Sequence, residues 1–291
     1  MPFDFIGLAN VVCSGLLTGA VYGLLALGLS VIFGVARVVN FAHGEITALA
    51  MYAAAILFAS LGVDPFVAVA PLAAGFFIFG YLLHGAVIHR FVDRPEHAQF
   101  ILLLAIAIVI TNGLLIAFGP DARAVSLDYL LESVEVGPLL IDRGKLYAAA
   151  AALSAAAALF LFFRFTATGT AIRACADNLQ GARIVGLDVK HLYALAFGLG
   201  AASASVAGCM LAVLAELTPG SGPAYTLLAF VIVIVGGLGS MTGALIGGAL
   251  IGVAEALAGF YAAPSAKSMF SFALLIVVLL FRPRGLLGGK P

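Results

Sequence analysis

Long apolar runs separated by short polar breaks dominate the chain. Hydropathy interrupted at clusters of charge, glycine and proline predicts about nine membrane-crossing segments. They cover residues 7–36, 41–62, 66–88, 100–118, 145–165, 192–215, 225–240, 243–261 and 268–281. Runs such as 101–118 and 192–214 approach or exceed the roughly 18–20 residues that cross about 30 Å of hydrocarbon. The pattern therefore predicts a bundle of membrane-spanning helices.

Composition agrees with this interpretation. Of the 291 residues, 64% are hydrophobic and 10% are charged, whereas a soluble domain carries charge on roughly a quarter of its positions. The polar surface is too small to cover a globular core, which argues against a soluble enzyme, a disordered tail and a nucleic-acid binder. We expect an all-α polytopic membrane protein, a single transmembrane domain over 1–291, with about 8–9 transmembrane helices and Gly-interrupted or re-entrant segments.

Charge is distributed unevenly between the polar breaks. Two linkers are long: 119–144, which is acidic, and 166–191, which is basic. With nine spans, one side of the membrane receives Arg37, Arg90, Arg94, Arg164, Arg173, Arg183, Lys190, Arg282, Arg284 and Lys290. The other side receives Arg123, Arg143, Lys145 and Lys267. The positive-inside rule then places the C-terminus and linker 166–191 in the cytoplasm and the N-terminus outside. An eight-span count with one re-entrant segment would place the N-terminus inside.

Glycines recur at four-residue spacing in two of the apolar runs. The first series is Gly15, Gly19 and Gly23, and the second comprises the pairs Gly243 with Gly247 and Gly248 with Gly252. This spacing aligns small residues on one helix face, where two backbones can approach closely and gain dispersion contacts. The spacing predicts tight helix packing rather than a ligand site.

The segment Asn40–Glu45 interrupts the second apolar run. It contains Asn40, Phe41, His43, Gly44 and Glu45, and a charge near the bilayer centre costs at least about 2.5–3.5 kcal/mol on insertion scales. One interpretation is a broken helix that lines a translocation route. The other is a tight turn at the membrane surface with both ionisable groups solvated. The pair lacks a third ligand at metal-binding spacing, so no metal site is expected.

A second interruption contains Gly236, Gly237, Gly239 and Ser240. A glycine break in each half of a transporter points to a central site, so these residues are translocation-path candidates. A simple turn between helices explains them equally well. The run lacks the Lys-Ser/Thr of a Walker A phosphate loop. Because the sequence also shows no nucleophile–base pair, metal cluster or nucleotide loop, we expect a non-enzymatic protein without a cofactor of its own.

Glu255 lies within the eighth apolar run. An isolated carboxylate at membrane depth is a functional candidate by default, in a bundle interior or a proton path. Alternatively, it is protonated or hydrogen-bonded to neighbouring serines and backbone.

The basic linker 166–191 contains an alanine-rich stretch. Arg173 and Asp177, four residues apart, predict a short surface helix, and Gly186 is placed to end it. Small residues would let such a helix sit in a groove of a partner protein, whereas an ordinary solvated loop is the alternative.

Several stretches, in order along nearly the whole chain, carry a family resemblance. They are Gly19–Leu29, Val39–Glu45, Gly169–Asn178 with Ala182, Arg183 and Gly186, Ala229–Ser240 with Gly243, and Arg282–Gly288. Jointly these stretches resemble the LIV-type permeases of bacterial branched-chain amino acid ABC importers.

The resemblance implies one of two permease subunits in the bacterial inner membrane. Its partners would be a second LIV-type permease, two cytoplasmic ATPase subunits that bind the ATP, and a periplasmic binding protein that delivers the amino acid. A coupling helix would contact the ATPases, and by position it maps onto Gly169, Ala171, Arg173, Ala174, Asp177, Asn178, Ala182, Arg183 and Gly186. The family places 40–45 and 236–240 within the membrane core, and their contact with substrate is a hypothesis.

Other functions fit the same composition. In a proton-coupled secondary transporter, His43, Glu45 or Glu255 would carry protons. Urea or amide ABC permeases share the motifs, so the solute is left open. A non-transporting scaffold would gain nothing from the insertion cost of intramembrane carboxylates.

Overall fold

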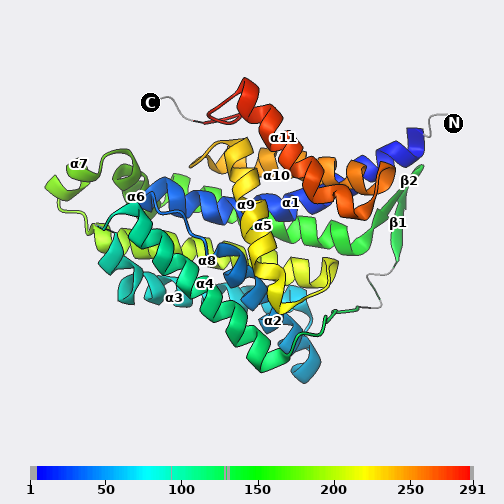
Figure 1. Ribbon diagram of the computed structural model, residues 1–291, viewed down its shortest axis with the longest axis horizontal. Coiled ribbons are helices and arrows are strands. Elements are labelled where there is room, and N and C mark those ends of the chain that lie inside the picture. Colours follow the sequence, from blue (N-terminus) through cyan, green and yellow to red (C-terminus); the bar gives the residue numbers. More distant parts are fainter. Residues whose placement is uncertain (1–4, 93, 128, 130–131, 289–291) are drawn as a thin grey trace.

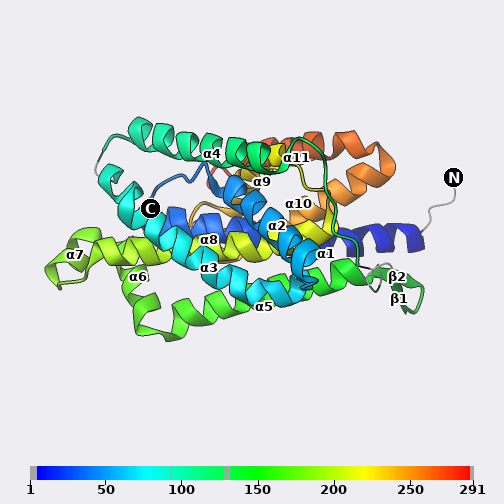
Figure 2. The same cartoon turned by 90° about the horizontal axis from the view of Figure 1, so that it is seen from below.

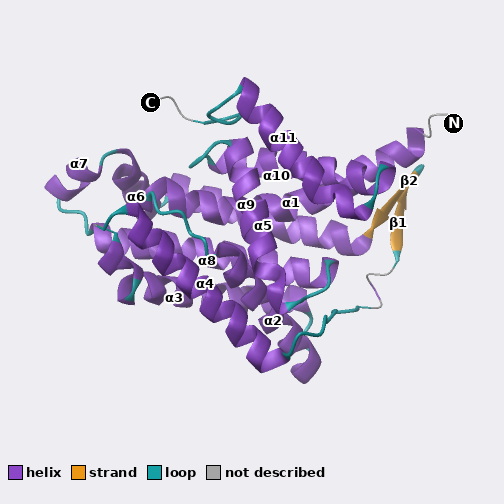
Figure 3. Ribbon diagram, in the orientation of Figure 1, coloured by secondary structure: helices purple, strands orange, loops and turns teal. Residues whose placement is uncertain are grey.

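The computed structural model describes residues 5–92, 94–127, 129 and 132–288, and it is a helical bundle (Figures 1 and 3). Within these residues, each expected span forms one helix. The helices are α1 (Phe5–Ala36), α2 (His43–Leu61), α3 (Pro65–Ala86), α4 (Glu96–Phe118), α5 (Arg143–Phe165), α8 (Val189–Leu214), α9 (Gly222–Gly236), α10 (Met241–Tyr261) and α11 (Lys267–Phe281). Seven of the described helices are long and apolar enough to cross a membrane, and α9 and α11 are shorter. The all-α polytopic fold is confirmed.

Helix α1 begins at one end of the bundle, and α11 runs from that end toward the other (Figure 1). We call the end where α1 begins the N-side and the end where α11 finishes the C-side. One cavity joins Asn10 and Lys267 at the N-side, and another joins Arg37 and Leu287 at the C-side. This arrangement agrees with an odd number of crossings. The side of the membrane that each end faces stays a prediction, and Lys290 lies outside the described residues.

Helices α1 and α8 form the centre of the bundle. They are the most deeply buried of the spans, and α1 packs against α8 and α10 while α3 packs against α8. In Figure 2, α4 and α11 lie on one side of this pair and α5 on the other. The outer helices expose large apolar side chains such as Ile116 and Leu280. Such exposure suits a surface that faces lipid rather than water.

The predicted glycine packing is found between α1 and α10. A Cβ atom on Gly19 would lie 2.6 Å from the carbonyl oxygen of Gly248, and one on Gly15 would lie 2.8 Å from that of Gly252. The two backbones are therefore in direct contact, which only residues without side chains allow. The interpretation of these glycines as packing residues is confirmed.

The acidic linker contains a hairpin that the sequence did not predict. Strand β1 (Ser133–Val136) pairs antiparallel with β2 (Leu139–Asp142). Gly137, at φ +61°, lies in the connecting turn. The amide of Leu140 donates to the Asn10 side chain across 2.9 Å, which fixes the hairpin against the start of α1. Strands of four residues are too short for hydrophobic periodicity to reveal.

The basic linker folds into two short helices rather than one. Helix α6 (Ala167–Asp177) is separated from α7 (Leu179–Ile184) at Asn178. The side-chain oxygen of Asn178 accepts a hydrogen bond from the amide of Gly181 and so caps α7. Gly186 follows α7 at φ +81°, the left-handed conformation that commonly ends a helix. The surface helix with Arg173 and Asp177 is confirmed, but it ends at Asp177, and Gly186 follows the second helix instead.

Candidate functional site

The connection between α1 and α2 turns back into the bundle. The Nε2 atom of His43, the first residue of α2, lies 2.9 Å from the carbonyl oxygen of Leu25. Leu25 precedes the end of α1 by eleven residues, which is about 16 Å along the helix axis. The side chains of His43 and Glu45 are 0% and 4% exposed. This burial excludes the solvated surface turn, and α2 begins inside the bundle.

Helix α9 begins beside the start of α2, after a short 3₁₀ turn (η3, Pro219–Ser221). The amide of Gly44 donates to Oγ1 of Thr226, and this hydroxyl donates to Oε2 of Glu45, each across 2.9 Å. Two helix N-termini, each with a partial positive charge, thus meet at one carboxylate. Paired discontinuous helices of this kind form the sites of many transporters.

We call Asn40, His43, Gly44, Glu45 and Thr226 the buried junction. The junction depends on the absence of a side chain at Gly44. A Cβ atom there would lie 2.6 Å from the Thr226 hydroxyl and would collide with the Gly222 carbonyl oxygen and the Thr226 nitrogen. Because α2 and α9 touch backbone to backbone at Gly44, the hydrogen bonds to Thr226 can form.

The junction keeps two polar atoms unpaired. Asn40 accepts a hydrogen bond from the amide of Ala42, but its Nδ2 atom and the Nδ1 atom of His43 are buried without a partner among the described residues. Buried polar atoms are almost always hydrogen-bonded, to protein or to ordered water. These two are therefore free to bind water or a polar solute.

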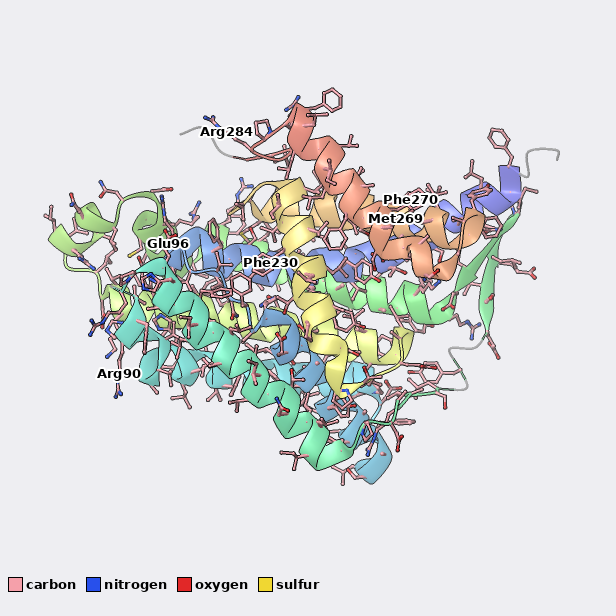
Figure 4. All side chains as sticks on the ribbon, viewed as in Figure 1. Arg90, Glu96, Phe230, Met269, Phe270 and Arg284 are labelled. Carbon is pink, nitrogen blue, oxygen red and sulfur yellow. The ribbon has the colours of Figure 1, made fainter. Side chains whose placement is uncertain are left out.

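Phe41 separates the junction from a cavity. Its ring centroid lies 4.6 Å from that of Phe100 on α4 and 5.0 Å from that of Phe230 on α9. Beyond these rings, a cavity of about 680 Å³ is lined by Phe41, Phe100, Arg37 and Glu96. Figure 4 shows Glu96 at the start of α4 and Phe230 along α9. Phe41 and Phe100 therefore lie on the wall of this cavity, and Phe230 contacts Phe41 beside the junction.

The segment Gly236–Ser240 forms a turn that lies apart from the junction. Gly237 and Gly239 adopt φ values of +107° and +78°, and Oγ of Ser240 caps α10 by accepting from the amide of Gly243 across 3.0 Å. Gly236 contacts Gly243 backbone to backbone. The structure therefore does not bring the two glycine interruptions together at one central point.

Comparison with known proteins decides the family. The family model for "branched-chain amino acid transport system / permease component" matches residues 11–279. The chain belongs to this family. It is 32% identical to the high-affinity branched-chain amino acid transport system permease protein LivH of Salmonella typhimurium, over 99% of this chain and 98% of the relative. It is 30% identical to the corresponding protein BraD of Pseudomonas aeruginosa, over 94% of each chain.

The fold of the permease also resembles a solved structure. PsaBC from Streptococcus pneumoniae in complex with Fab matches with a TM-score of 0.50 and 14% identity, over 93% of the permease and 91% of that chain. At this identity the likeness concerns the fold alone. The family resemblance found in the sequence is confirmed by the family model and the two relatives.

At the C-side of the permease, the glycine turn meets the basic linker. A cavity of about 920 Å³ is lined by Arg37, Arg173, Asp177, Gly239 and Ser240. Of the linker residues, Gly169 and Ala182 are buried, whereas Arg173, Ala174, Asp177, Asn178, Arg183 and Gly186 are exposed. One cavity is therefore lined both by residues assigned to ATPase coupling and by residues assigned to the translocation path. The first are Arg173 and Asp177, and the second are Gly239 and Ser240.

Glu255 of the permease is half-buried on α10. Its Oε1 atom accepts a hydrogen bond from Oγ of Ser271 on α11 across 2.8 Å. Tyr22 and Tyr225 line a cavity together with it. The hydrogen-bonded interpretation of Glu255 is thus confirmed, and its role in transport stays a prediction.

Sequence reasoning missed Thr226, Tyr22 and Tyr225. The available signal was the run Thr218–Pro223, which reads Thr-Pro-Gly-Ser-Gly-Pro immediately before an apolar stretch. Such a cluster marks a break before a helix. It shows where α9 starts, and Thr226 lies one turn further on.

Proposed function

We propose that the chain is the membrane-spanning permease subunit of an ATP-driven importer of branched-chain or related amino acids. In this assembly it pairs with a second LIV-type permease, binds two cytoplasmic ATPase subunits and receives its solute from a periplasmic binding protein. The similarity to two branched-chain amino acid permease proteins over nearly the full length supports this proposal.

The observation that carries the coupling role is the position of α6 and α7. Helix α7 protrudes from the bundle at the C-side (Figure 1), and α6 joins it to the bundle by packing against α1, α5 and α8. At the tip, Ile184 and Val185 are 85% and 74% exposed. Large apolar side chains at a polar, basic membrane end suit burial in a groove of another protein. We assign α6–α7 as the contact with the ATPases, and the C-side as cytoplasmic.

The proposed mechanism is alternating access around the buried junction. ATP-driven association of the ATPases pulls on α6–α7, and the bundle rearranges to open first outward and then inward. Contacts made in only one state supply the differential stabilisation that such a shift requires. Phe41, the junction residues, Gly236–Ser240 and Glu255 are our candidates along the path.

Replacing both Arg173 and Asp177 by alanine tests the coupling role. Both side chains are exposed and line the C-side cavity. We expect at least roughly tenfold weaker ATPase binding and uptake, the effect of losing an interface hot spot. Co-purification of the ATPases and uptake of labelled leucine measure the two quantities. Lys190→Ala, also exposed but outside that cavity, is the matched control. Unchanged assembly and uptake in the double variant would reject the assignment.

The energy source of uptake and the identity of the transported solute distinguish the proposed function from its alternatives. Uptake into cells that express all subunits should depend on ATP and should persist with a protonophore when ATP is held constant. Excess unlabelled isoleucine or valine should compete with leucine, and urea or acetamide should not. Collapse of uptake by the protonophore at constant ATP would favour a secondary transporter. Competition by urea would favour the amide relatives.

Cysteine labelling tests the orientation. In a chain lacking its native cysteines, Arg183→Cys should react with an impermeant maleimide only from the cytoplasm, and Glu135→Cys only from outside. Both positions are exposed. In the parent chain, which retains Cys175, that thiol should react slowly in either orientation, because burial raises its pKa and keeps it protonated. Labelling of Arg183→Cys from outside would reverse the assignment.

A further inference from the structure

A second polar cavity lies at the N-side, distant from the C-side cavity. It has a volume of about 490 Å³ between α1, β2, α10 and the start of α11. This size falls within the range of roughly 300–1,000 Å³ that is usual for small-molecule sites. Lys145, Lys267, Asp142 and Glu255 bring charges of both signs to its wall.

Among the described residues, the charged side chains that line this cavity form no ion pairs with one another. Nζ of Lys145 donates to Oγ of Ser14 across 2.7 Å, and Glu255 accepts from Ser271. Asp142 accepts from the backbone amide of Lys145 and caps α5. Within the described part of the chain, Glu132 with Arg143 is the one ion pair, so neither lysine pairs with a carboxylate. Opposite charges that face one cavity without pairing suit a ligand that carries both signs.

The rest of the wall is apolar and includes glycine. Leu17, Ile141 and Phe260 contribute apolar surface, and Gly252 and Gly259 of α10 line the same cavity without a side chain. An apolar side chain of a ligand would pack against this part of the wall. The lining therefore matches a molecule with a charged end and a short hydrocarbon end.

A second cavity adjoins the N-side cavity. A neighbouring cavity of about 340 Å³ shares Tyr22, Glu255 and Lys267 with it and is also lined by Tyr225. Tyr225 directly precedes Thr226, which binds Glu45 in the junction. Glu255 thus lines both cavities.

We infer that the N-side cavity binds a free α-amino acid with an apolar side chain, its ammonium group on Glu255 and its carboxylate on Lys145 and Lys267. The inference rests on the proposed function, because it takes the transported solute as the ligand. The cavity then serves as the first binding site on the permease, between delivery and passage through the junction.

Binding to the purified permease in nanodiscs tests the inference without its partners. The probes are L-leucine, 4-methylpentanoate, which lacks the ammonium group, and 3-methylbutylamine, which lacks the carboxylate. A hydrogen bond to a charged group contributes about 1.5–3 kcal/mol, so each analogue should bind at least roughly tenfold more weakly than leucine. Equal binding of the three compounds would overturn the inference.

Variants locate the site. Glu255→Gln and Lys267→Gln should each weaken leucine binding at least roughly tenfold, and Lys190→Gln, at the opposite end of the bundle, should not change it. Lys267 is exposed, so its variant tests the site without disturbing the core. Binding by both variants as tight as by the parent chain would overturn the inference. Native mass spectrometry showing a phospholipid that Lys267→Gln releases and that leucine fails to displace would also overturn it.

Uptake by the full assembly separates this inference from the proposed function. If the parent chain with its partners transports no branched-chain amino acid, the proposed function fails and the ligand class fails with it. If the parent chain transports leucine while Glu255→Gln and Lys267→Gln bind and transport it equally well, only the N-side site fails.

Discussion

Gly44→Ala is expected to abolish amino acid uptake, although it adds a single methyl group. The added Cβ atom would collide with backbone atoms of Gly222 and Thr226, which cannot rotate away as a side chain does. Helices α2 and α9 would have to separate, and the hydrogen bonds through Thr226 would lengthen. Overpacking of this kind costs about 1–3 kcal/mol or more. Uptake of labelled leucine and the thermal midpoint of the purified chain measure the effect.

Gly75→Ala on α3 is the matched control. Gly75 is also within a helix, but no described atom lies within 4 Å of the position its Cβ would take. Alanine favours a helix over glycine by roughly 0.5–1 kcal/mol, so uptake should be unchanged and the midpoint equal or slightly higher. If Gly44→Ala behaved like Gly75→Ala, the close contact of α2 with α9 would be refuted.

Thr226→Val is expected to lower both stability and uptake while preserving side-chain volume. The hydroxyl accepts from the amide of Gly44 and donates to Glu45. Without it, a buried N–H group and a buried carboxyl oxygen lose their partner, at about 1–3 kcal/mol each. We expect a loss of about 2 kcal/mol or more in the free energy of unfolding. Denaturation of the purified chain, followed by helical signal, measures it.

Thr226→Ser isolates the hydroxyl from the methyl group. Serine retains the donor and the acceptor, so most of the stability and uptake should be retained. A valine variant as stable and active as the serine variant would show that the junction does not depend on this hydrogen bond.

Much of the fold can be predicted from the sequence, because each membrane span is one continuous apolar stretch. Each apolar run forms one helix, because a helix that crosses the hydrocarbon core needs about 20 consecutive, mostly apolar residues. The four-residue spacing of Gly15, Gly19 and Gly23 predicts close packing, because it is a property of one helix face. The surface helix containing Arg173 is also predicted by a local pattern, the four-residue spacing of Arg173 and Asp177. The hairpin 133–142 was missed because its strands are too short to show a period.

The junction could be located only in part. Asn40, His43 and Glu45 are conspicuous, because polar residues are rare in an apolar run. Thr226 is a single hydroxyl 181 positions away from Glu45, and hydropathy carries no information on which helices meet. The second break in helical structure beside the junction is therefore the start of α9, at Pro219–Gly222, and the more glycine-rich Gly236–Ser240 is the turn at its far end.

Two consecutive residues of α9 lie near Glu255 and Glu45. Tyr225 faces the cavity of Glu255, and Thr226 binds Glu45. Consecutive helical residues point about 100° apart around the axis, so a twist of α9 moves both side chains through the same angle. A rotation of α9 would therefore alter the surroundings of Glu45 and Glu255 together. Helix α9 thus links the buried junction to the cavity beside Glu255.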